Sequence, residues 1–384
     1  MAKLGDICVF QSGGTPSKNK PEYFGGKIPW ISTTALNGGK INEADAVAWI
    51  TPKAIRESAA KIVPANSIMV GTRVGIGKVA INTVEMSTSQ DVISLINIDE
   101  DKWYKPYLCK LLLSKKDYFN SQARGATIKG IKIDVVANID VPEIDYATQR
   151  KVAATLNKID TLIVLRKQQL AKLDELVKAR FVEMFGTFPA NPFRWSIGKI
   201  QDVVSDVRYG SSRPAVEGGK YPYLRMNNIT YSGELDLRDT KQIDIPDSEL
   251  DKCTVRRGDV LFNRTNSKEL VGKTCVYNRD ELMVLAGFVI RVRINERIRP
   301  EVLSAFLNMD FSKRMLIGMC KTAIGQANIN AKELQNIDLY IPPIELQDQF
   351  VTLKNKIDQQ KQTVQQSLEK LELLKKALMQ EYFG

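Results

Sequence analysis

The feature that most constrains the fold of this chain is an internal duplication. Residues 158–186, KIDTLIVLRKQQLAKLDELVKARFVEMFG, return in altered form at 356–384 as KIDQQKQTVQQSLEKLELLKKALMQEYFG. The same offset relates the segment NID at 138–140 to its copy at 336–338. A repeat of this length indicates that one architectural unit is built twice. We therefore expect two similar domains, each followed by a long helix.

The parts that precede the two helices match more loosely. Residues 28–42 resemble 221–236, and residues 63–81 resemble 255–277. Short β-branched runs alternate there with Gly, Pro, Asn and Ser, which is typical of strands joined by turns. The sequence thus predicts an α+β chain with two pseudo-symmetric, strand-rich domains separated by a pair of long antiparallel coiled-coil helices. The expected domains are 1–148 and 187–343, and the expected helices are 149–186 and 344–384.

Both helices carry an apolar stripe with alternating spacings of three and four residues, which is typical of a coiled-coil seam. The first stripe contains Leu156, Ile159, Ile163, Leu170, Leu173, Val177 and Met184, and Arg166 and Arg180 interrupt it. The second contains Ile357, Val364, Leu368, Leu371 and Leu378, and Lys361 and Lys375 interrupt it. A seam of about 30 residues is roughly 45 Å long at 1.5 Å per residue. A pseudo-two-fold axis favours antiparallel pairing; the alternative is that each helix packs separately on its own domain.

The glycine-rich stretch GTRVGIGK at 71–78 has the look of a phosphate-binding loop, but it lacks the required pattern. Gly71 and Gly77 have five residues between them instead of four, and Val79 follows Lys78 where a P-loop needs Ser or Thr. The next residues are β-branched, so no helix N-terminus is expected there to hold a phosphate. We predict a β-turn between two strands.

The composition indicates which kind of partner the chain can bind and which catalytic chemistry it lacks. The chain has 55 Lys and Arg against 44 Asp and Glu, a net charge of +11, which favours an anionic partner, nucleic acid before membrane, although many ordinary proteins are basic. It contains no His, which excludes His-based triads and His metal sites. The five cysteines are isolated, and no apolar run reaches membrane-spanning length. We expect a cytoplasmic protein with reduced thiols and no contact with a membrane.

Several segments together resemble the specificity subunit of type I restriction–modification systems. They are LGDICVFQSGGTPSK (4–18), IPWISTTAL (28–36), GTRVGIGKVAI (71–81), DVLFNRTNSKELVGK (259–273) and the duplicated helix ends FVEMFG and LMQEYFG. The resemblance implies that each domain reads half of a split sequence in double-stranded DNA. It also implies that the helices space the domains and bind two DNA adenine methyltransferase subunits, with ATP-dependent restriction subunits in the same complex. Catalysis would belong to those partners, so we expect no cofactor, no metal site and no catalytic residue in this chain.

Candidate DNA contacts are turn residues that can donate to base edges or to phosphates. The first domain offers Gly14, Thr15, Ser17, Thr33, Thr34, Thr72, Arg73, Lys78, Ser87, Thr88, Gln90, Arg124, Lys129 and Lys132. The second offers Arg208, Tyr209, Ser211, Ser212, Arg213, Arg225, Asn227, Asn228, Arg264, Thr265, Asn266, Lys268, Lys273, Lys321, Gln326 and Asn328. Arg73 and Arg264 are favoured, since each follows an apolar run and opens a polar loop in its repeat. The alternative for every one of these positions is a solvated turn residue.

Two other functions remain to be separated from DNA recognition. The first is a non-catalytic coiled-coil scaffold whose basic domains bind DNA without sequence preference. The second is an enzyme that fuses methyl transfer to recognition, but NPFR at 191–194 lacks the second Pro of the adenine methyltransferase loop and reads better as a linker. Selection from random-sequence DNA distinguishes the first, and methyl transfer by the single chain distinguishes the second.

Overall fold

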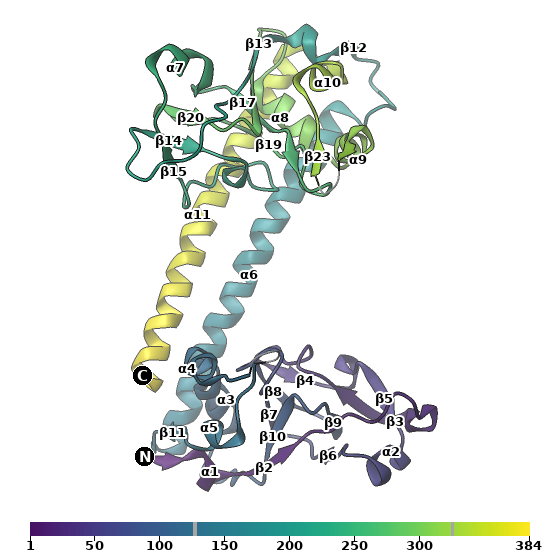
Figure 1. Cartoon of the computed structure of the whole chain (residues 1–384), viewed down its shortest axis with the longest axis vertical. Helices are drawn as coiled ribbons and strands as arrows, with labels where there is room; N and C mark the ends of the chain where they lie inside the picture. Colours follow the sequence, from purple (N-terminus) through teal and green to yellow (C-terminus); the bar gives the residue numbers. More distant parts are fainter. Residues whose placement is uncertain (126–128, 324–325) are drawn as a thin grey trace. The chain divides into compact units, whose positions relative to one another are not determined.

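The structure is a computed structural model that describes residues 1–125, 129–323 and 326–384. The chain forms two compact units (Figure 1). Unit 1 contains Met1–Arg166 and Ser367–Gly384, and unit 2 contains Lys167–Gln366. The two long helices, α6 (Tyr146–Phe185) and α11 (Ile344–Phe383), therefore each contribute residues to both units.

Unit 1 consists of short strands that precede a group of helices. In chain order its elements before α6 are β1 (Ala2–Lys3), α1 (Leu4–Ile7), β2 (Val9–Ser12), β3 (Phe24–Ile31), β4 (Lys40–Ile41), β5 (Ala48–Ile50), α2 (Pro52–Glu57), β6 (Ile62–Val63), β7 (Ile68–Gly71), β8 (Val79–Asn82), β9 (Met86–Thr88), β10 (Val92–Ile96), α3 (Lys105–Ser114), α4 (Lys116–Gln122), α5 (Ile133–Ala137) and β11 (Asp140–Val141). One sheet has the order β2-β10-β7-β8-β4, a second has β5-β3-β9-β6, and β1 pairs with β11.

The central strand β7 explains how these layers pack. Successive side chains of a strand point to opposite faces of the sheet. Ile68 and Val70 pack into a core with α3, α4, α5 and the first turns of α6, whereas Met69 packs into a separate core with the second sheet. Both faces of β7 are thus covered, which is why this strand reads as a continuous apolar run in the sequence.

Unit 2 repeats the same plan. Its elements after α6 and before α11 are β12 (Ser196–Lys199), β13 (Val204–Tyr209), β14 (Tyr221–Leu224), β15 (Lys241–Ile243), α7 (Asp247–Cys253), β16 (Thr254–Val255), β17 (Val260–Asn263), β18 (Thr265–Asn266), β19 (Thr274–Val276), β20 (Met283–Leu285), β21 (Val289–Ile294), α8 (Pro300–Asn308), α9 (Asp310–Met319), β22 (Lys321–Ala323), β23 (Gln326–Asn328), α10 (Ala331–Gln335) and β24 (Asp338–Ile341). Its sheets have the orders β13-β21-β17-β19, β15-β14-β20-β16 and β18-β23-β22, and β12 pairs with β24.

The two sheet topologies correspond strand by strand. β2, β10, β7 and β8 occupy the places that β13, β21, β17 and β19 occupy in unit 2. In the second sheets, β3 pairs with β9 in parallel and β14 pairs with β20 in parallel, while the other neighbours are antiparallel. This agreement confirms the predicted α+β class and the duplicated, strand-rich domains.

Local signals set the limits of α6. Asp145 precedes the helix, and its carboxylate accepts a hydrogen bond from the backbone N–H of Thr148 at 2.9 Å, which satisfies one of the free donors of the first turn. At the other end Gly186 has φ +83° and donates its N–H to the carbonyl of Val182 at 2.8 Å. A glycine in the left-handed region is the usual helix terminator because it has no Cβ to clash.

The helices pair in antiparallel fashion within each unit. In unit 1, Asp160 of α6 lies 2.6 Å from Lys375 of α11, and the Nε of Arg166 donates to Ser367 at 3.2 Å. In unit 2, Phe181 contacts Phe350 with ring centroids 5.6 Å apart. Asp174 of unit 2 also pairs with Lys361. In both units, contacts made by later residues of α6 are therefore to earlier residues of α11. The predicted antiparallel helix pair is therefore confirmed, against separate packing of the two helices.

The two lysines that interrupt the second apolar stripe have partners at the seam, whereas Arg180 of the first stripe pairs with Glu183 of its own helix. Lys361 is buried and pairs with both Asp174 and Glu234, and Lys375 pairs with Asp160. Burial alone lowers the pKa of Lys361, but the hydrogen bonds and charges of the two carboxylates outweigh it and raise the pKa above its ordinary value. The two lysines are therefore tolerated in the stripe because each is matched across it.

Candidate DNA interface

In unit 1, backbone hydrogen bonds bring separate predicted segments to one end of the central sheet. The N–H of Thr72, just after β7, donates to the carbonyl of Asp91, just before β10, at 2.8 Å. The N–H of Ile131 donates to the carbonyl of Thr72 at 2.8 Å, and the N–H of Gly14 donates to Thr88 at 2.9 Å. A Cβ on Gly14 would lie 2.0 Å from a backbone oxygen, so only glycine fits this close approach.

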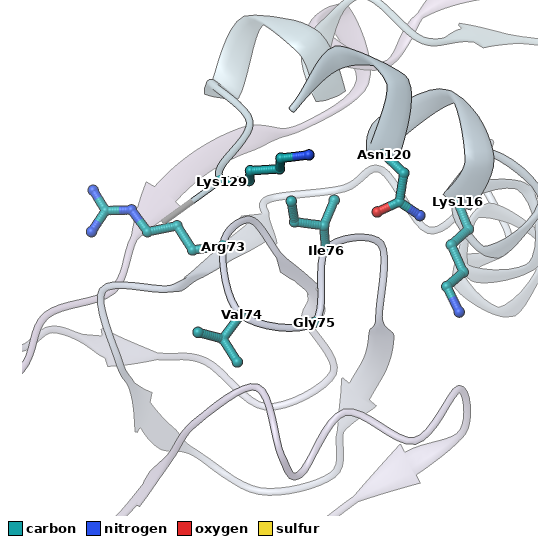
Figure 2. A pocket seen from close by; sticks show the side chains of 7 residues that line it. All are labelled: Arg73, Val74, Gly75, Ile76, Lys116, Asn120 and Lys129. Atoms are coloured by element: carbon teal, nitrogen blue, oxygen red, sulfur yellow. The ribbon is translucent and has the colours of Figure 1, made fainter. Parts of the chain in front are cut away.

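A hollow of about 450 Å³ opens beside this meeting point (Figure 2). Its lining residues are Arg73, Val74, Gly75, Ile76, Lys116, Asn120 and Lys129. The side chains of Arg73 and Lys129 come from the two loops, whereas Lys116 and Asn120 come from α4 (Figure 2). Asp91 lies 3.8 Å from Arg73. The hollow thus carries three cations, which suits an anionic group such as a phosphate.

Sequence reasoning found part of this hollow and missed the rest. Arg73 and Lys129 belong to the predicted set, whereas Lys116, Asn120 and Asp91 do not. A signal was present for Lys116, since Lys115 and Lys116 stand side by side just after Ser114, which ends the mostly apolar run YLCKLLL. The long-range folding of α4 over the β7–β8 turn decides that Lys116 and not Lys115 lines the hollow.

The stretch GTRVGIGK is a tight connection between two strands, as predicted. The N–H of Gly71 donates to Lys78 at 2.8 Å, and the N–H of Gly77 donates back to Gly71 at 3.0 Å. Gly75 and Gly77 have φ +73° and +74°, which favours glycine at both places. Strand β8 follows at Val79. The loop thus leads into a strand where a P-loop leads into a helix, which agrees with the exclusion of a P-loop.

Unit 2 builds the same frame from different residues. The N–H of Arg264 donates to Phe288 at 3.0 Å, and the N–H of Ile329 donates to Arg264 at 2.9 Å. These bonds match those of Thr72 in unit 1, so Arg264 takes the place of Thr72 and not that of Arg73. Arg73 and Arg264, which the sequence places at the start of corresponding loops, therefore stand one residue apart in the shared frame.

The closing Gly-Lys of the two loops does correspond. Asn263 donates its N–H to Lys273 at 2.8 Å, and Gly272 donates to Asn263 at 2.8 Å, as Gly71 and Gly77 do in unit 1. Lys273 is buried, and its ammonium donates to the carbonyl of Met226 at 3.0 Å. Burial lowers the pKa of Lys273. This lysine therefore stabilises the loop through a hydrogen bond and does not face solvent.

Exposure divides the predicted contact residues into two groups. Those with exposed side chains are Thr15, Ser17, Thr34, Arg73, Lys78, Gln90, Arg124, Lys129, Lys132, Arg208, Tyr209, Ser212, Arg213, Asn227, Lys268 and Asn328. Arg225, Arg264 and Asn266 are half-buried, whereas Gly14, Thr33, Thr72, Ser87, Thr88, Ser211, Asn228, Thr265 and Lys273 are buried. Strands β22 and β23 contain Lys321 and Gln326, whose side chains lie outside the described part. A buried member can act on DNA only by supporting a neighbour.

Three of the predicted arginines of unit 2 form ion pairs within the protein. Arg208 pairs with Asp206 at 2.8 Å, Arg213 with Glu249 at 2.7 Å, and Arg225 with Asp239 at 3.0 Å. Each of these cations has part of its charge neutralised before any DNA arrives. Arg264 differs, since its guanidinium lies over the ring of Tyr209 with 4.8 Å between the guanidinium carbon and the ring centroid.

The described ranges contain neither a cluster of metal ligands nor a membrane-spanning helix. Among residues 1–125, 129–323 and 326–384, no group of three or more Cys, Asp or Glu is arranged to hold a metal ion. Within the same ranges, no helix is both long and apolar enough to span a membrane.

Comparison with known proteins agrees with this geometry. The family model described as type I restriction modification DNA specificity domain matches residues 1–175 and 194–373. The chain belongs to this family. It is accordingly a DNA-recognition subunit and not a catalytic one, and the family match spans both copies of the duplicated domain.

Individual relatives are distant in sequence. The specificity subunit of the type I restriction enzyme EcoKI from Escherichia coli K12 is 23% identical over 84% of this chain and 74% of its own length. The MjaIX specificity subunit from Methanocaldococcus jannaschii is 28% identical over 62% of each chain. The crystal structure of an S subunit from M. genitalium is 15% identical and superposes with a TM-score of 0.57, over 100% of this chain and 95% of that one. This last likeness concerns the fold.

Proposed function

We propose that this specificity subunit recognises a DNA target in two parts, with residues 1–148 reading one part and residues 187–343 the other. The observation that carries the proposal is the frame at the strand ends, which both domains build with the same backbone hydrogen bonds and fill with different side chains. A repeated scaffold with different side chains suits two half-sites of different sequence. Base edges differ in their pattern of hydrogen-bond donors and acceptors, and different side chains are needed to match them.

The charges at the frame support contact with a duplex. Arg73, Lys116 and Lys129 surround the hollow of unit 1, with Asp91 as a partner for Arg73 at 3.8 Å. Lysines of this kind position the backbone, whereas the forked guanidinium of Arg73 can also bind a guanine through two acceptors. The proposal therefore assigns Lys116 and Lys129 to phosphates and Arg73 to a base.

The helices 149–186 and 344–384 are proposed as the spacer and as the docking surface for two DNA adenine methyltransferase subunits, with ATP-dependent restriction subunits joining the same complex. The exposed apolar side chains of unit 1 support a protein partner there. They are Val164 and Leu165 on α6 and Leu373 and Leu374 on α11. Leu373 is 69% exposed, which is costly for a surface that stays in water.

We further propose that the subunit works in the cytoplasm. The described cysteines are free, and Cys8, Cys109, Cys253 and Cys275 are buried. Burial raises the pKa of the Cys8 and Cys109 thiols to about 12, so these groups stay protonated and unreactive. Free, inert thiols suit a reducing compartment.

Selection from random-sequence duplex DNA with the reconstituted complex tests the proposed function. We expect two short blocks of sequence with a fixed gap. Arg73→Ala should weaken the preference within one block and Arg264→Ala within the other, each by about 1–3 kcal/mol at one position if the contact is bidentate. Arg238→Ala is the matched control, since Arg238 is exposed and pairs with Asp236.

A single contiguous block would contradict the two-part target. No enrichment at all would favour a scaffold that binds DNA without sequence preference. Loss of preference in both blocks from either arginine variant would contradict the assignment of one block to each domain.

A further inference from the structure

Three residues meet at the strand ends of unit 2, and one of them, Phe288, has no role in the function proposed above. Tyr209 ends β13, Arg264 follows β17, and Phe288 precedes β21, the strand between them in the sheet. Arg264 donates its N–H to the carbonyl of Phe288 at 3.0 Å, so the two residues are locked side by side. Phe288 is 51% exposed although it is a large apolar residue.

The guanidinium of Arg264 is held in one place by the ring beneath it. Its central carbon lies 4.8 Å from the centroid of Tyr209, within the range of a cation–π contact. The hydroxyl of Tyr209 accepts a hydrogen bond from the N–H of Ala331 at 2.8 Å, which fixes the ring. The Nε of Arg264 is buried and has no hydrogen-bond partner among the described residues, and its Nη1 reaches the carbonyl of Gly287 only at 3.5 Å. Among the described residues of unit 2, no carboxylate pairs with the guanidinium of Arg264, in contrast to those of Arg208, Arg213 and Arg225.

Unit 1 carries small polar residues at the same three places of the frame. Ser12 ends β2, where it pairs with Ile93 as Tyr209 pairs with Ile290. Thr72 stands for Arg264 and Asp91 for Phe288, joined by the equivalent backbone bond at 2.8 Å. The frame therefore folds without an aromatic platform and without an arginine, so folding does not require the three large residues of unit 2.

We propose that Arg264 and Phe288 read adjacent bases in the half-site of the second domain, with Tyr209 as a positioning residue. Arg264 takes a guanine, whose N7 and O6 accept two hydrogen bonds from one guanidinium. Phe288 takes the neighbouring thymine through its methyl group, since a phenyl ring offers apolar contact and no hydrogen bond. The inference rests on the proposed function, because it presupposes that the second domain reads its own half-site.

The test uses the reconstituted complex and its selected duplex. Replacing thymine by deoxyuridine in the second half-site removes the methyl group alone, and replacing guanine by 7-deazaguanine removes the N7 acceptor alone. For the unaltered subunit we expect roughly threefold weaker binding with deoxyuridine at one position and on the order of tenfold weaker binding with 7-deazaguanine at the adjacent position. Phe288→Ala should abolish only the first effect, and Arg264→Ala only the second.

Two further variants separate positioning from folding. Tyr209→Phe loses the hydrogen bond from Ala331 but keeps the ring under the guanidinium, so it should retain most of the 7-deazaguanine effect, whereas Tyr209→Ala should lose it. Phe193→Ala is the matched control for Phe288, because Phe193 is also an exposed aromatic residue of unit 2, at 47%, and it should leave both effects unchanged.

Different outcomes would contradict the base assignments and the proposed function on which they rest. If selection yields no second half-site, the proposed function fails. If a second half-site is selected but lacks an adjacent guanine and thymine, or if Phe288→Ala leaves the deoxyuridine effect intact, the inference is overturned and the proposed function stands. If Tyr209→Phe loses the 7-deazaguanine effect as fully as Tyr209→Ala, the positioning role is overturned.

Discussion

The carboxylate of Asp160 holds two lysines of unit 1 together, and its removal should destabilise that unit. Asp160 lies on α6, 2.7 Å from the ammonium of Lys110 on α3 and 2.6 Å from that of Lys375 on α11. Lys110 is buried, with 6% of its side chain exposed. Asp160→Asn keeps the shape of the side chain and leaves two like charges close together without their counter-charge.

The expected cost follows from burial. Removing one partner of a fully buried ion pair costs about 3–5 kcal/mol, because a charge remains in a poorly solvated place. Asp160 is about a third exposed, at 31%, so solvent screens part of the effect and we expect about 2–3 kcal/mol. The repeat supplies a control. Asp358 occupies the equivalent place in α11 but pairs with Lys354 one turn away, whose side chain is 22% exposed against 6% for Lys110, so Asp358→Asn should cost about 0.5 kcal/mol.

The effect should also depend on pH. Burial alone raises the pKa of Asp160, but the hydrogen bonds and charges of Lys110 and Lys375 outweigh it and lower the pKa below its ordinary value. A carboxyl with a lowered pKa stabilises the folded state above its unfolded pKa, and this contribution is lost as pH falls through the folded pKa. The difference between the parent and Asp160→Asn should therefore be full at pH 7 and shrink below about pH 4.

Urea unfolding of the full chain measures the two variants, with hydrogen exchange of residues 105–114 as a readout local to α3. We expect faster exchange in α3 for Asp160→Asn and little change for Asp358→Asn. Equal effects of the two substitutions would refute the reasoning, since they would mean that burial of the lysine partner does not set the cost.

Two more predictions follow from buried groups elsewhere. Burial lowers the pKa of Lys313 to about 7, so the unfolded chain binds more protons than the folded chain between about pH 7 and pH 10. The free energy of unfolding should therefore rise with pH in this range by up to about 1.4 kcal/mol per pH unit. Lys313→Met should remove this slope in unfolding measured at pH 7, 8 and 9, and a slope that persists would contradict the prediction. Gly77→Ala should cost about 1 kcal/mol more than Gly25→Ala in thermal unfolding. Both glycines have φ near +75°, but a Cβ on Gly77 meets the Cα of Lys116 at 3.2 Å, whereas a Cβ on Gly25 meets no described atom within 4 Å. Equal costs would show that backbone strain alone sets the effect.

Features that depend on residues close together in the chain could be predicted from the sequence. The seam of α6 and α11 could be predicted because helix geometry repeats every few residues, so a run such as Ile357, Val364 and Leu368 must lie on one face. The turn at Gly77 could be predicted as well, because a glycine in the left-handed region and the strand after it are local properties. The duplication followed from direct comparison of one segment with another.

Tertiary structure alone decided which side chains share a site. Arg264 corresponds to Thr72 and not to Arg73, which only the hydrogen bonds between β17 and β21 reveal, and a shift of one residue along a strand sends a side chain to the opposite face. Lys116 reaches Arg73 because α4 folds over a turn that lies far back along the chain. Phe288 stands beside Arg264 for the same reason. Contacts of this kind depend on the packing of distant segments, whose register no local pattern encodes.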